Sequence, residues 1–446
     1  MKIFNKIYYH KKNLYEIAKK ILQVSNKKLC DVNIILSKDI GIKVLTRHGI
    51  MNNIEFYDSS NFVITIFLNN RKGIISFNNI ELKNICNIID KVILMTNHLS
   101  YDPFVGVPDL DLLAHNYLDL DLFHLWEFNI SEAIGLASLA EMTALNFDSR
   151  IVSTEGGEFI SNVNIKLFAN NYDIFNFCIS SSYYLSCCVV AKSKNEMERD
   201  YFYTVSRKIS DLDKPEYIGK NCALRVLKRL NPLKLITGTY PIIFLSDISN
   251  HLFKYLVIAI SGHNVYRKST CLYRYLNKEI FPTWLNINER PHILRGLFSS
   301  YFDSEGVRTV DHIIVLNGVL KKWLLTSYSG RQLGFKSTGH YDGIHNWFVS
   351  HSDISLKSLL CKVDNCILVT ELIGQGVNIV TGDYSKGAFG FWVNKGVIEY
   401  PINEITISGN LKDMWKNILY LSNDIDKRSN IQCGSILLSD MQVSGL

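Results

Sequence analysis

The chain has 446 residues, of which 47% are hydrophobic and 20% are charged. This composition excludes a disordered or fibrous protein, and the length exceeds the roughly 250–300 residues that one hydrophobic core organises, so two domains are expected. The formal net charge of +6 comes from scattered basic residues that form no basic arm, so direct nucleic-acid binding is not expected.

In the first half, the hydrophobic pattern predicts helices and strands in alternation. Apolar residues at helical spacing predict a helix around 14–22 and a second around 85–93, and the apolar runs on either side of 69–73 predict a β-hairpin. Residues 100–121 lose this periodicity and gain Asp, Pro and Gly, which indicates a connector.

Further along, Ser131 is expected to cap a helix, because its hydroxyl can accept an unpaired backbone N–H. Strands are expected from 150 to 208 with a break at Gly156-Gly157, followed by a helix over 217–230.

The second half is rich in predicted strands. A strand is expected at 241–245, followed by a helix that Asp247 caps and that runs to 260. Hairpin turns are expected at Asn317-Gly318 and at 394–396. We place an N-terminal α/β domain at 1–232, with the connector inside it, and a C-terminal domain at 233–446. The predicted class is α+β, with an N-terminal mixed sheet covered by helices and a C-terminal curved or barrel-like mixed sheet.

The sequence has no long apolar segment of the roughly 20 residues that span a membrane, and its beginning does not read as a secretory signal. Its ten cysteines are irregularly spaced and contain no CxxC, which is typical of buried free thiols in a reducing compartment. We therefore expect a cytoplasmic protein without membrane contact.

Common catalytic motifs are absent: the sequence contains no HExxH or HExxxH zinc motif, no GxSxG nucleophile motif and no GxxxxGK[ST] phosphate loop. The densest polar segment is 337–347. Its His340, Asp342 and His345 could hold a metal or a peptide, but the pattern favours hydrogen bonds that steady a Gly-rich turn. Both interpretations stay open.

Two more polar segments favour a structural interpretation. Asp303 and Glu305 could share one face of a strand as an acid/base pair, but such residues more often bind Arg308 or backbone groups at a turn. Segment 381–387 is expected to be a compact turn in which Asp383 bonds its own backbone.

Several phrases resemble the TldD/PmbA family of metallopeptidase-related proteins. They include FDSEGVRT from Phe302, KSTGH from Lys336, GIHNW from Gly343, ELIGQGVN from Glu371, TGDYSKGAFGFWV from Thr381 and RSNIQCGS from Arg428. The likeness covers nearly the whole chain and is most specific from about residue 241 onward. It is greatest to the PmbA (TldE) branch, which lacks the zinc motif.

The resemblance implies where a zinc site would stand. In the TldD branch a helix carries His-Glu-x-x-x-His, and a downstream cysteine helps to hold the zinc. Here His251 is followed by Leu252, and Leu256 takes the place of the second histidine, while Cys433 stands about where the cysteine ligand would be. The resemblance thus implies that zinc is bound by a TldD-like partner chain, in a heterodimer that cleaves unfolded or small peptides, and not by this chain.

The leading hypothesis is therefore a PmbA/TldE-like subunit of a cytoplasmic metallopeptidase, without catalytic or metal-binding residues of its own. The alternatives are a metalloprotease in its own right, for which His340, His345 and Cys433 are the available ligands, and a protein-binding modulator related to gyrase or to an RNA-binding regulator. The residues predicted to line a substrate or partner cleft are Arg267, Ser269, Thr338, His340, His345, Asn346, Asp383 and Cys433.

Overall fold

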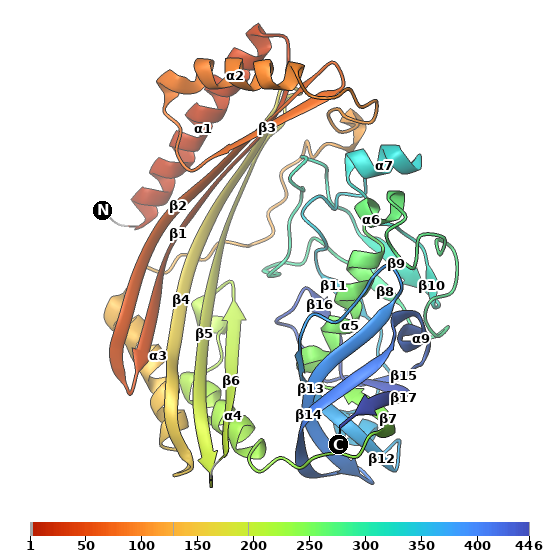
Figure 1. Ribbon diagram of the computed structural model, residues 1–446. Helices are drawn as coiled ribbons and strands as arrows, with labels where there is room; N and C mark the ends of the chain where they lie inside the picture. Colours follow the sequence, from red (N-terminus) through yellow and green to blue (C-terminus); the bar gives the residue numbers. More distant parts are fainter. Residues whose placement is uncertain (1–2, 128, 195, 446) are drawn as a thin grey trace.

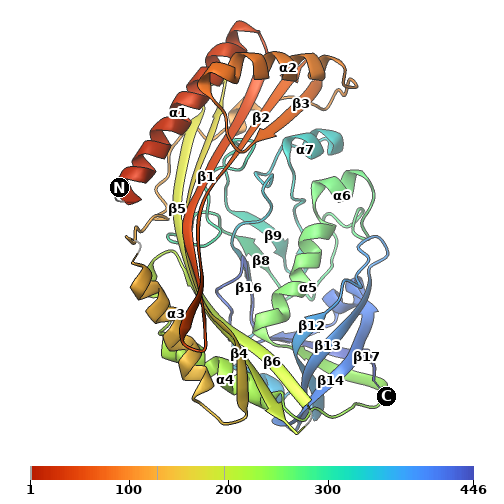
Figure 2. The same cartoon turned by 60° about the vertical axis from the view of Figure 1, so that its left-hand side comes forward.

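The structure is a computed structural model that describes residues 3–127, 129–194 and 196–445. Figure 1 shows one long curved sheet from the N-terminal half standing beside a C-terminal half that is built from smaller sheets and short helices. Figure 2 shows the long sheet bending around the C-terminal half. The class is α+β, as predicted.

The N-terminal sheet has six strands in the order β3-β2-β1-β4-β5-β6. Every pairing in it is antiparallel, so the prediction of a mixed N-terminal sheet was wrong in this detail. Its elements in chain order are α1 (Ile3–Lys27), β1 (Asp31–Arg47), β2 (Ile50–Leu68), β3 (Arg71–Phe77), η1 (Leu82–Asn84), α2 (Ile85–Asn97), η2 (Leu110–Leu112), α3 (Ile130–Leu145), β4 (Ile151–Asn170), β5 (Phe175–Ser193), β6 (Glu196–Ser206), η3 (Ile209–Asp211) and α4 (Pro215–Lys228).

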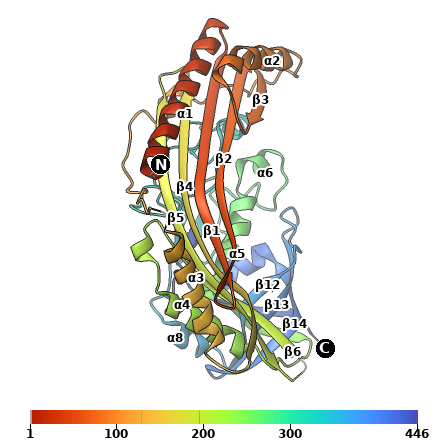
Figure 3. The ribbon, with the colours of Figure 1, turned by 90° about the vertical axis from the view of Figure 1, so that its left-hand side faces the viewer.

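All four long helices of this half cover the same face of the sheet. Ile34 and Leu36 of β1 pack with α1 and α2, whereas Ile42 and Val44 of the same strand pack with α3 and α4. These positions are all even, and residues two apart point to the same side of a strand. Figure 3 shows the helices on this outer face. The opposite face is thus left to meet the C-terminal half.

Two local expectations in this half were wrong. The cap of α3 is Asn129, whose side chain accepts from the backbone N–H of Glu132, because the helix begins before Ser131. Gly156-Gly157 does not break the strand: β4 runs through both residues with a register shift between Thr154 and Gly156. A Cβ on Gly156 would lie 2.3 Å from the carbonyl oxygen of Thr46, so the glycine lets β1 approach closely.

The C-terminal half contains a closed barrel and a separate five-stranded sheet. The barrel consists of β7, β12, β13, β14 and β17, in which β7 and β12 are parallel and the other neighbours antiparallel, and it closes through β14 and β17. This confirms the predicted barrel-like mixed sheet. The smaller sheet has the order β10-β9-β8-β11-β16.

The elements of this half follow in chain order: β7 (Gly238–Phe244), α5 (Ser246–Ala259), α6 (Gly262–Tyr266), β8 (Ile287–Glu289), β9 (His312–Leu316), β10 (Val319–Leu320), α7 (Ser327–Leu333), β11 (Trp347–Val349), α8 (Leu356–Leu360), β12 (Asn365–Ile373), β13 (Asp383–Asn394), β14 (Val397–Asn410), α9 (Leu411–Lys416), β15 (Ile418–Leu421), β16 (Ile431–Gln432) and β17 (Ile436–Ser444). The predicted boundary between residues 232 and 233 falls in the segment that joins α4 to β7.

Both hairpin turns predicted in this half are present in the structure. Asn317 and Gly318 join β9 to β10 with φ of 49° and 76°, and Lys395 and Gly396 join β13 to β14 with φ of 48° and 80°. The predicted cap of α5 was wrong, because the helix begins after Leu245 without a side-chain cap and the carboxylate of Asp247 pairs with arginines instead.

A small hydrophobic cluster joins the two halves. Tyr301 and Phe302 of the C-terminal half pack with Phe168 of β4 and with Leu113 and Leu120 of the connector. Phe168 lies on the sheet face opposite the four helices. Within the described residues, no helix combines the length and apolar character needed to cross a membrane.

Candidate functional site

A cavity of about 240 Å³ lies between the two halves, where β6 and α4 face α5 and β12. Its wall is densely charged. Asp247 at the start of α5 accepts from Arg225 of α4 and from Arg428, whose other Nη donates to the carbonyl oxygen of Tyr203 in β6 at 3.1 Å. Arg428 of the C-terminal half therefore binds the last strand of the N-terminal sheet at this cavity.

The helix α5 contributes His251 to the wall of this cavity. Burial, together with the positive charges of Lys254 and Lys386, lowers the pKa of His251 to about 4, so the ring is neutral near pH 7. The following residue Leu252 is 3% exposed and Leu256 is 0% exposed, and both belong to the main core of the C-terminal half. The helix thus offers one imidazole to the cavity and leucines to the core.

The thiol of Cys433 also reaches α5. Its Sγ lies 3.0 Å from Oγ of Ser249, and the side chain is buried. Burial raises the pKa of Cys433 to about 12, so the thiol stays protonated at neutral pH. A protonated, enclosed thiol is a packed side chain and not a reactive one.

A second polar group is buried in the C-terminal half. Nε2 of His340 lies 2.5 Å from Oε2 of Glu289, and Nδ1 of His345 lies 3.2 Å from Oε1 of the same carboxylate. The backbone N–H of His345 also donates to Oε1, at 2.7 Å. Burial works against the ionised carboxylate, but the hydrogen bonds from His340 and His345 outweigh it and lower the pKa of Glu289 below its usual value.

Two neighbours hold the His340 ring in place. Nδ1 of His340 is 2.8 Å from the hydroxyl of Thr338, which also accepts from the backbone N–H of Leu325 at 2.7 Å. His312 stacks on the His340 ring with centroids 5.3 Å apart, and its Nε2 donates to the carbonyl oxygen of Thr338. Burial lowers the pKa of His312 to about 4, so this third ring of the group is neutral near pH 7.

Asp303 and Glu305 organise a turn. Asp303 accepts from the backbone N–H groups of Glu305, Val307 and Tyr341, and Glu305 accepts from the N–H of Ser327 at the start of α7. Burial, reinforced by the nearby charge of Glu305, raises the pKa of Asp303. These contacts match the turn interpretation, since both carboxylates bind backbone groups.

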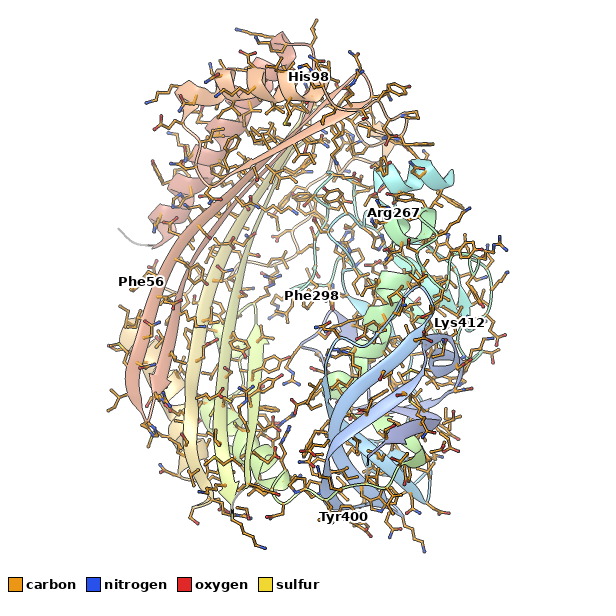
Figure 4. All side chains as sticks on the ribbon, in the orientation of Figure 1. Phe56, His98, Arg267, Phe298, Tyr400 and Lys412 are labelled. Atoms are coloured by element: carbon orange, nitrogen blue, oxygen red, sulfur yellow. The ribbon has the colours of Figure 1, made fainter. Side chains whose placement is uncertain are left out.

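The eight predicted cleft residues do not form one site. Thr338, His340 and His345 come together around Glu289. Arg267 is exposed after α6, where Figure 4 shows it in the C-terminal half, and the hydroxyl of Ser269 donates to the carbonyl of Arg267 at 3.5 Å. Asn346 donates to the carbonyl of Arg290 and to Ser299, while Asp383 is exposed and its carboxylate accepts from Thr381. Cys433 lies against α5.

Family models match most of the chain. The PmbA/TldA metallopeptidase C-terminal domain matches residues 237–445, and the PmbA/TldA metallopeptidase central domain matches residues 123–230. The chain is 47% identical over 445 residues to the metalloprotease PmbA of Escherichia coli O157:H7, covering 100% of this chain and 99% of that protein. The chain belongs to the PmbA/TldD metallopeptidase family.

Both branches of the family appear among its relatives in Buchnera aphidicola (subsp. Acyrthosiphon pisum, strain APS). A metalloprotease PmbA homolog there is 46% identical over 100% of both chains. A metalloprotease TldD homolog from the same strain is 21% identical and covers 67% of this chain and 66% of that protein. A solved Bacteroides thetaiotaomicron structure, whose name refers to modulation of DNA gyrase, shares the fold with a TM-score of 0.91 at 24% identity, over 97% and 99% of the two chains.

Helix α5 does not fit the zinc that the family name implies. A zinc site of this kind needs at least three protein ligands, of which cysteine binds as the thiolate. On and around α5 the structure provides one histidine, two core leucines and a protonated thiol that bonds to Ser249. No chemical step can therefore be assigned to a metal at this helix.

Sequence analysis missed the carboxylate that organises the second polar group. Glu289 lies 51 residues before His340 in the chain and carries no local motif, so only the sheet pairing reveals it. The pairing sets Glu289 opposite Trp347 on one side and His312 on the other. Asp247 was noticed only as a helix cap, although its charge pairs with Arg225 and Arg428.

Proposed function

We propose that this chain is the PmbA-type subunit of a cytoplasmic metallopeptidase, and that a TldD-like partner chain supplies the catalytic zinc. The observation that carries this proposal is the burial of Leu252 and Leu256 in the core, at positions where a zinc-binding helix of this family would present glutamate and histidine. Leucine side chains have no donor atoms with which to bind a metal or to activate water.

Two further observations support a paired arrangement. The chain is similar over its full length to PmbA-named proteins. PmbA and TldD homologs also occur together in one Buchnera strain, so both kinds of chain are available to the same cell there. We therefore expect the complex to be a heterodimer.

The role that we propose for this chain is to bind and orient a peptide. An extended peptide gains main-chain hydrogen bonds when it adds to the last strand of a sheet. The C-terminal strands offer little for this, because the barrel is closed and the outer strands β10 and β16 have two residues each. The last strand β6 of the N-terminal sheet has 11 residues and lines the 240 Å³ cavity with Tyr201, Phe202 and Tyr203.

Peptide hydrolysis by the separate and combined chains tests this proposal. The purified chain alone is expected to hydrolyse no unfolded peptide, and a mixture with a TldD-like chain is expected to give an activity that a chelator removes and added zinc restores. The matched control replaces the motif glutamate of the partner by glutamine, which should silence the mixture. Peptide hydrolysis by this chain alone would overturn the proposal.

The alternative of a metalloprotease that relies on His340, His345 and Cys433 lacks a supporting geometry. The buried group of ligand atoms combines the two histidines with Glu289, whereas Cys433 bonds to Ser249 on α5. We therefore retain the auxiliary role as the proposed function.

A further inference from the structure

The buried group of Glu289, His340 and His345 has the composition of a metal site. One oxygen of the carboxylate and one nitrogen of each imidazole all lie within 4.8 Å of one another. Two imidazoles and a carboxylate are a donor set that suits Zn²⁺ among the common divalent ions. All three side chains are buried, at 1%, 1% and 8% exposure for Glu289, His340 and His345.

The sheet and a short loop bring these donors together. Glu289 ends β8 in the middle of the five-stranded sheet, between His312 of β9 and Trp347 of β11. His340 and His345 lie on the loop that leads into β11, which turns at Gly339 and Gly343 with φ of 75° and 98°. The donor atoms thus come from a strand and from a loop that has no strand or helix of its own.

The hydrogen bonds around His340 can fix the tautomer in which Nε2 binds an ion. When Nδ1–H donates to the hydroxyl of Thr338, that hydroxyl can donate to the carbonyl oxygen of Leu325, which lies 3.3 Å away. In that tautomer the lone pair of Nε2 is available to an ion, whereas without an ion the ring can donate from Nε2 to Glu289. A hydrogen-bonded outer partner that fixes the imidazole in this way is a regular feature of metal-binding histidines. Without an ion, the 2.5 Å contact between Nε2 and Oε2 contains a proton, which a bound metal would displace.

The buried charge of Glu289 also favours a cation. Glu289 accepts from the backbone N–H of His345, so this carboxylate already binds the loop without an ion. The ammonium group of Lys166 pairs with Asp342 instead. Buried carboxylates are costly unless a positive group compensates them.

Two cavities border the group without being lined by Glu289 or His345. A cavity of about 310 Å³ is lined by His340, Tyr341 and Gly343, and a second of about 340 Å³ is lined by His312 and Thr338. The donor side chains themselves are almost completely enclosed. This favours a structural ion over one that binds substrate.

We propose that Glu289, His340 and His345 bind one divalent metal ion of the zinc class, which fastens loop 336–346 to strand β8. The inference goes beyond the proposed function and is independent of it, because this ion is not at α5 and takes no part in peptide hydrolysis. Thr338 is a positioning residue that orients His340.

Metal content and thermal unfolding of the full chain test this site. The isolated chain is stripped with a chelator, dialysed, and titrated with Zn²⁺ while bound zinc and the Tm are measured. One zinc per chain and a raised Tm are expected. Failure of the stripped wild-type chain to bind one equivalent would overturn the proposal.

Variants assign the zinc to these residues. Glu289→Gln and His345→Gln are expected to lose the bound zinc and the Tm response, and Thr338→Val is expected to weaken binding about 10–100-fold. His351→Gln, which removes an exposed histidine, is the matched control and should bind like the wild type. If the ligand variants do not fold, Thr338→Val decides, and unchanged zinc affinity in it would contradict the site.

The outcome is separable from that of the proposed function. Zinc bound by the isolated chain without peptide hydrolysis supports the site and leaves the proposed function intact. Peptide hydrolysis by the zinc-loaded chain that disappears in His345→Gln would refute the structural role of the ion, and it would also refute the partner as the source of catalytic zinc.

Discussion

The buried imidazole of His251 makes the stability of the chain depend on pH in a defined window. Burial lowers the pKa of His251 to about 4 in the folded state, against 6.5 for the free side chain. The unfolded chain therefore binds a proton that the folded chain refuses between these two values. The neutral ring therefore makes its full contribution to the unfolding free energy above pH 6.5, and this contribution is lost as the pH falls from 6.5 toward 4.

The magnitude follows from the pKa difference. At pH 4.5 the full difference corresponds to about 2.5 kcal/mol, and because the ring is partly exposed to solvent in the cavity we expect about 1–2 kcal/mol. The variant His251→Gln has no ring to protonate. Between about pH 7.5 and pH 4.5 the wild type is therefore expected to lose about 1–2 kcal/mol more unfolding free energy than the variant.

Urea unfolding at the two pH values, followed by circular dichroism and by tryptophan fluorescence, measures this difference. His351→Gln is the control for removal of a histidine, since that residue is exposed. Other buried histidines such as His312 contribute equally to the wild type and the variant, so they cancel in the comparison. If the wild type and His251→Gln lose the same free energy over this range, the ring is not held neutral and the reasoning fails.

Three further substitutions test the packing between and within the halves. Asp247→Asn removes the negative charge shared by Arg225 and Arg428 and should lower the unfolding free energy by about 1–2 kcal/mol in urea, whereas a change below about 0.5 kcal/mol would mean that the ion pairs add nothing. Gly306→Ala adds a Cβ 2.2 Å from the ring of Phe168 at a φ of 79°, so we expect the unfolding free energy to fall by about 2–4 kcal/mol. The control is Gly135→Ala in α3, where the new Cβ meets open space and the unfolding free energy should rise by up to about 1 kcal/mol. Trp415→Ala empties a fully buried position and removes the hydrogen bond from Nε1 to the carbonyl of Leu252, which should cost about 3–5 kcal/mol and would be contradicted by an unchanged Tm.

Turn residues and hydrophobic spacing correctly predicted features that depend on residues close together in the chain. Asn317-Gly318 adopts positive φ at both positions, as a two-residue hairpin turn requires, and the apolar spacing of Leu14, Ile17 and Ile21 describes the buried face of α1. The same rules failed where a tertiary contact decides. Gly156 looked like a break because glycine ends many strands, but here it admits the backbone of Thr46 at a bulge inside β4.

The extent of the long sheet was also hidden from the sequence. The apolar run from Phe62 predicted only the end of β2, because the first half of this 19-residue strand is mostly exposed and mixes polar residues with exposed apolar ones such as Ile50 and Phe56. The pairing with β1 continues through that exposed part. An exposed strand has no hydrophobic alternation to reveal it, so its partner strand fixes it instead.

The candidate sites show the same division between local and distant information. The motif comparison alone located His251, Leu252 and Leu256 on one helix, because these residues are neighbours in the chain. The group at Glu289 was only half visible, since its histidines share a loop but their carboxylate comes from a strand 51 residues earlier. Joining them requires the register of β8 with β11, which no short segment encodes.

The central claim is that peptide hydrolysis depends on donor atoms of the partner chain and on none at α5 of this one. Its most direct test is the hydrolysis rate of the complex assembled with a His251→Gln, Cys433→Ser double variant of this chain. We predict that this complex keeps the zinc of the unmodified complex and still hydrolyses peptide, with at most weaker binding of peptide because His251 lines the cavity. Loss of both, with the heterodimer still formed, would show that this chain itself holds the catalytic ion.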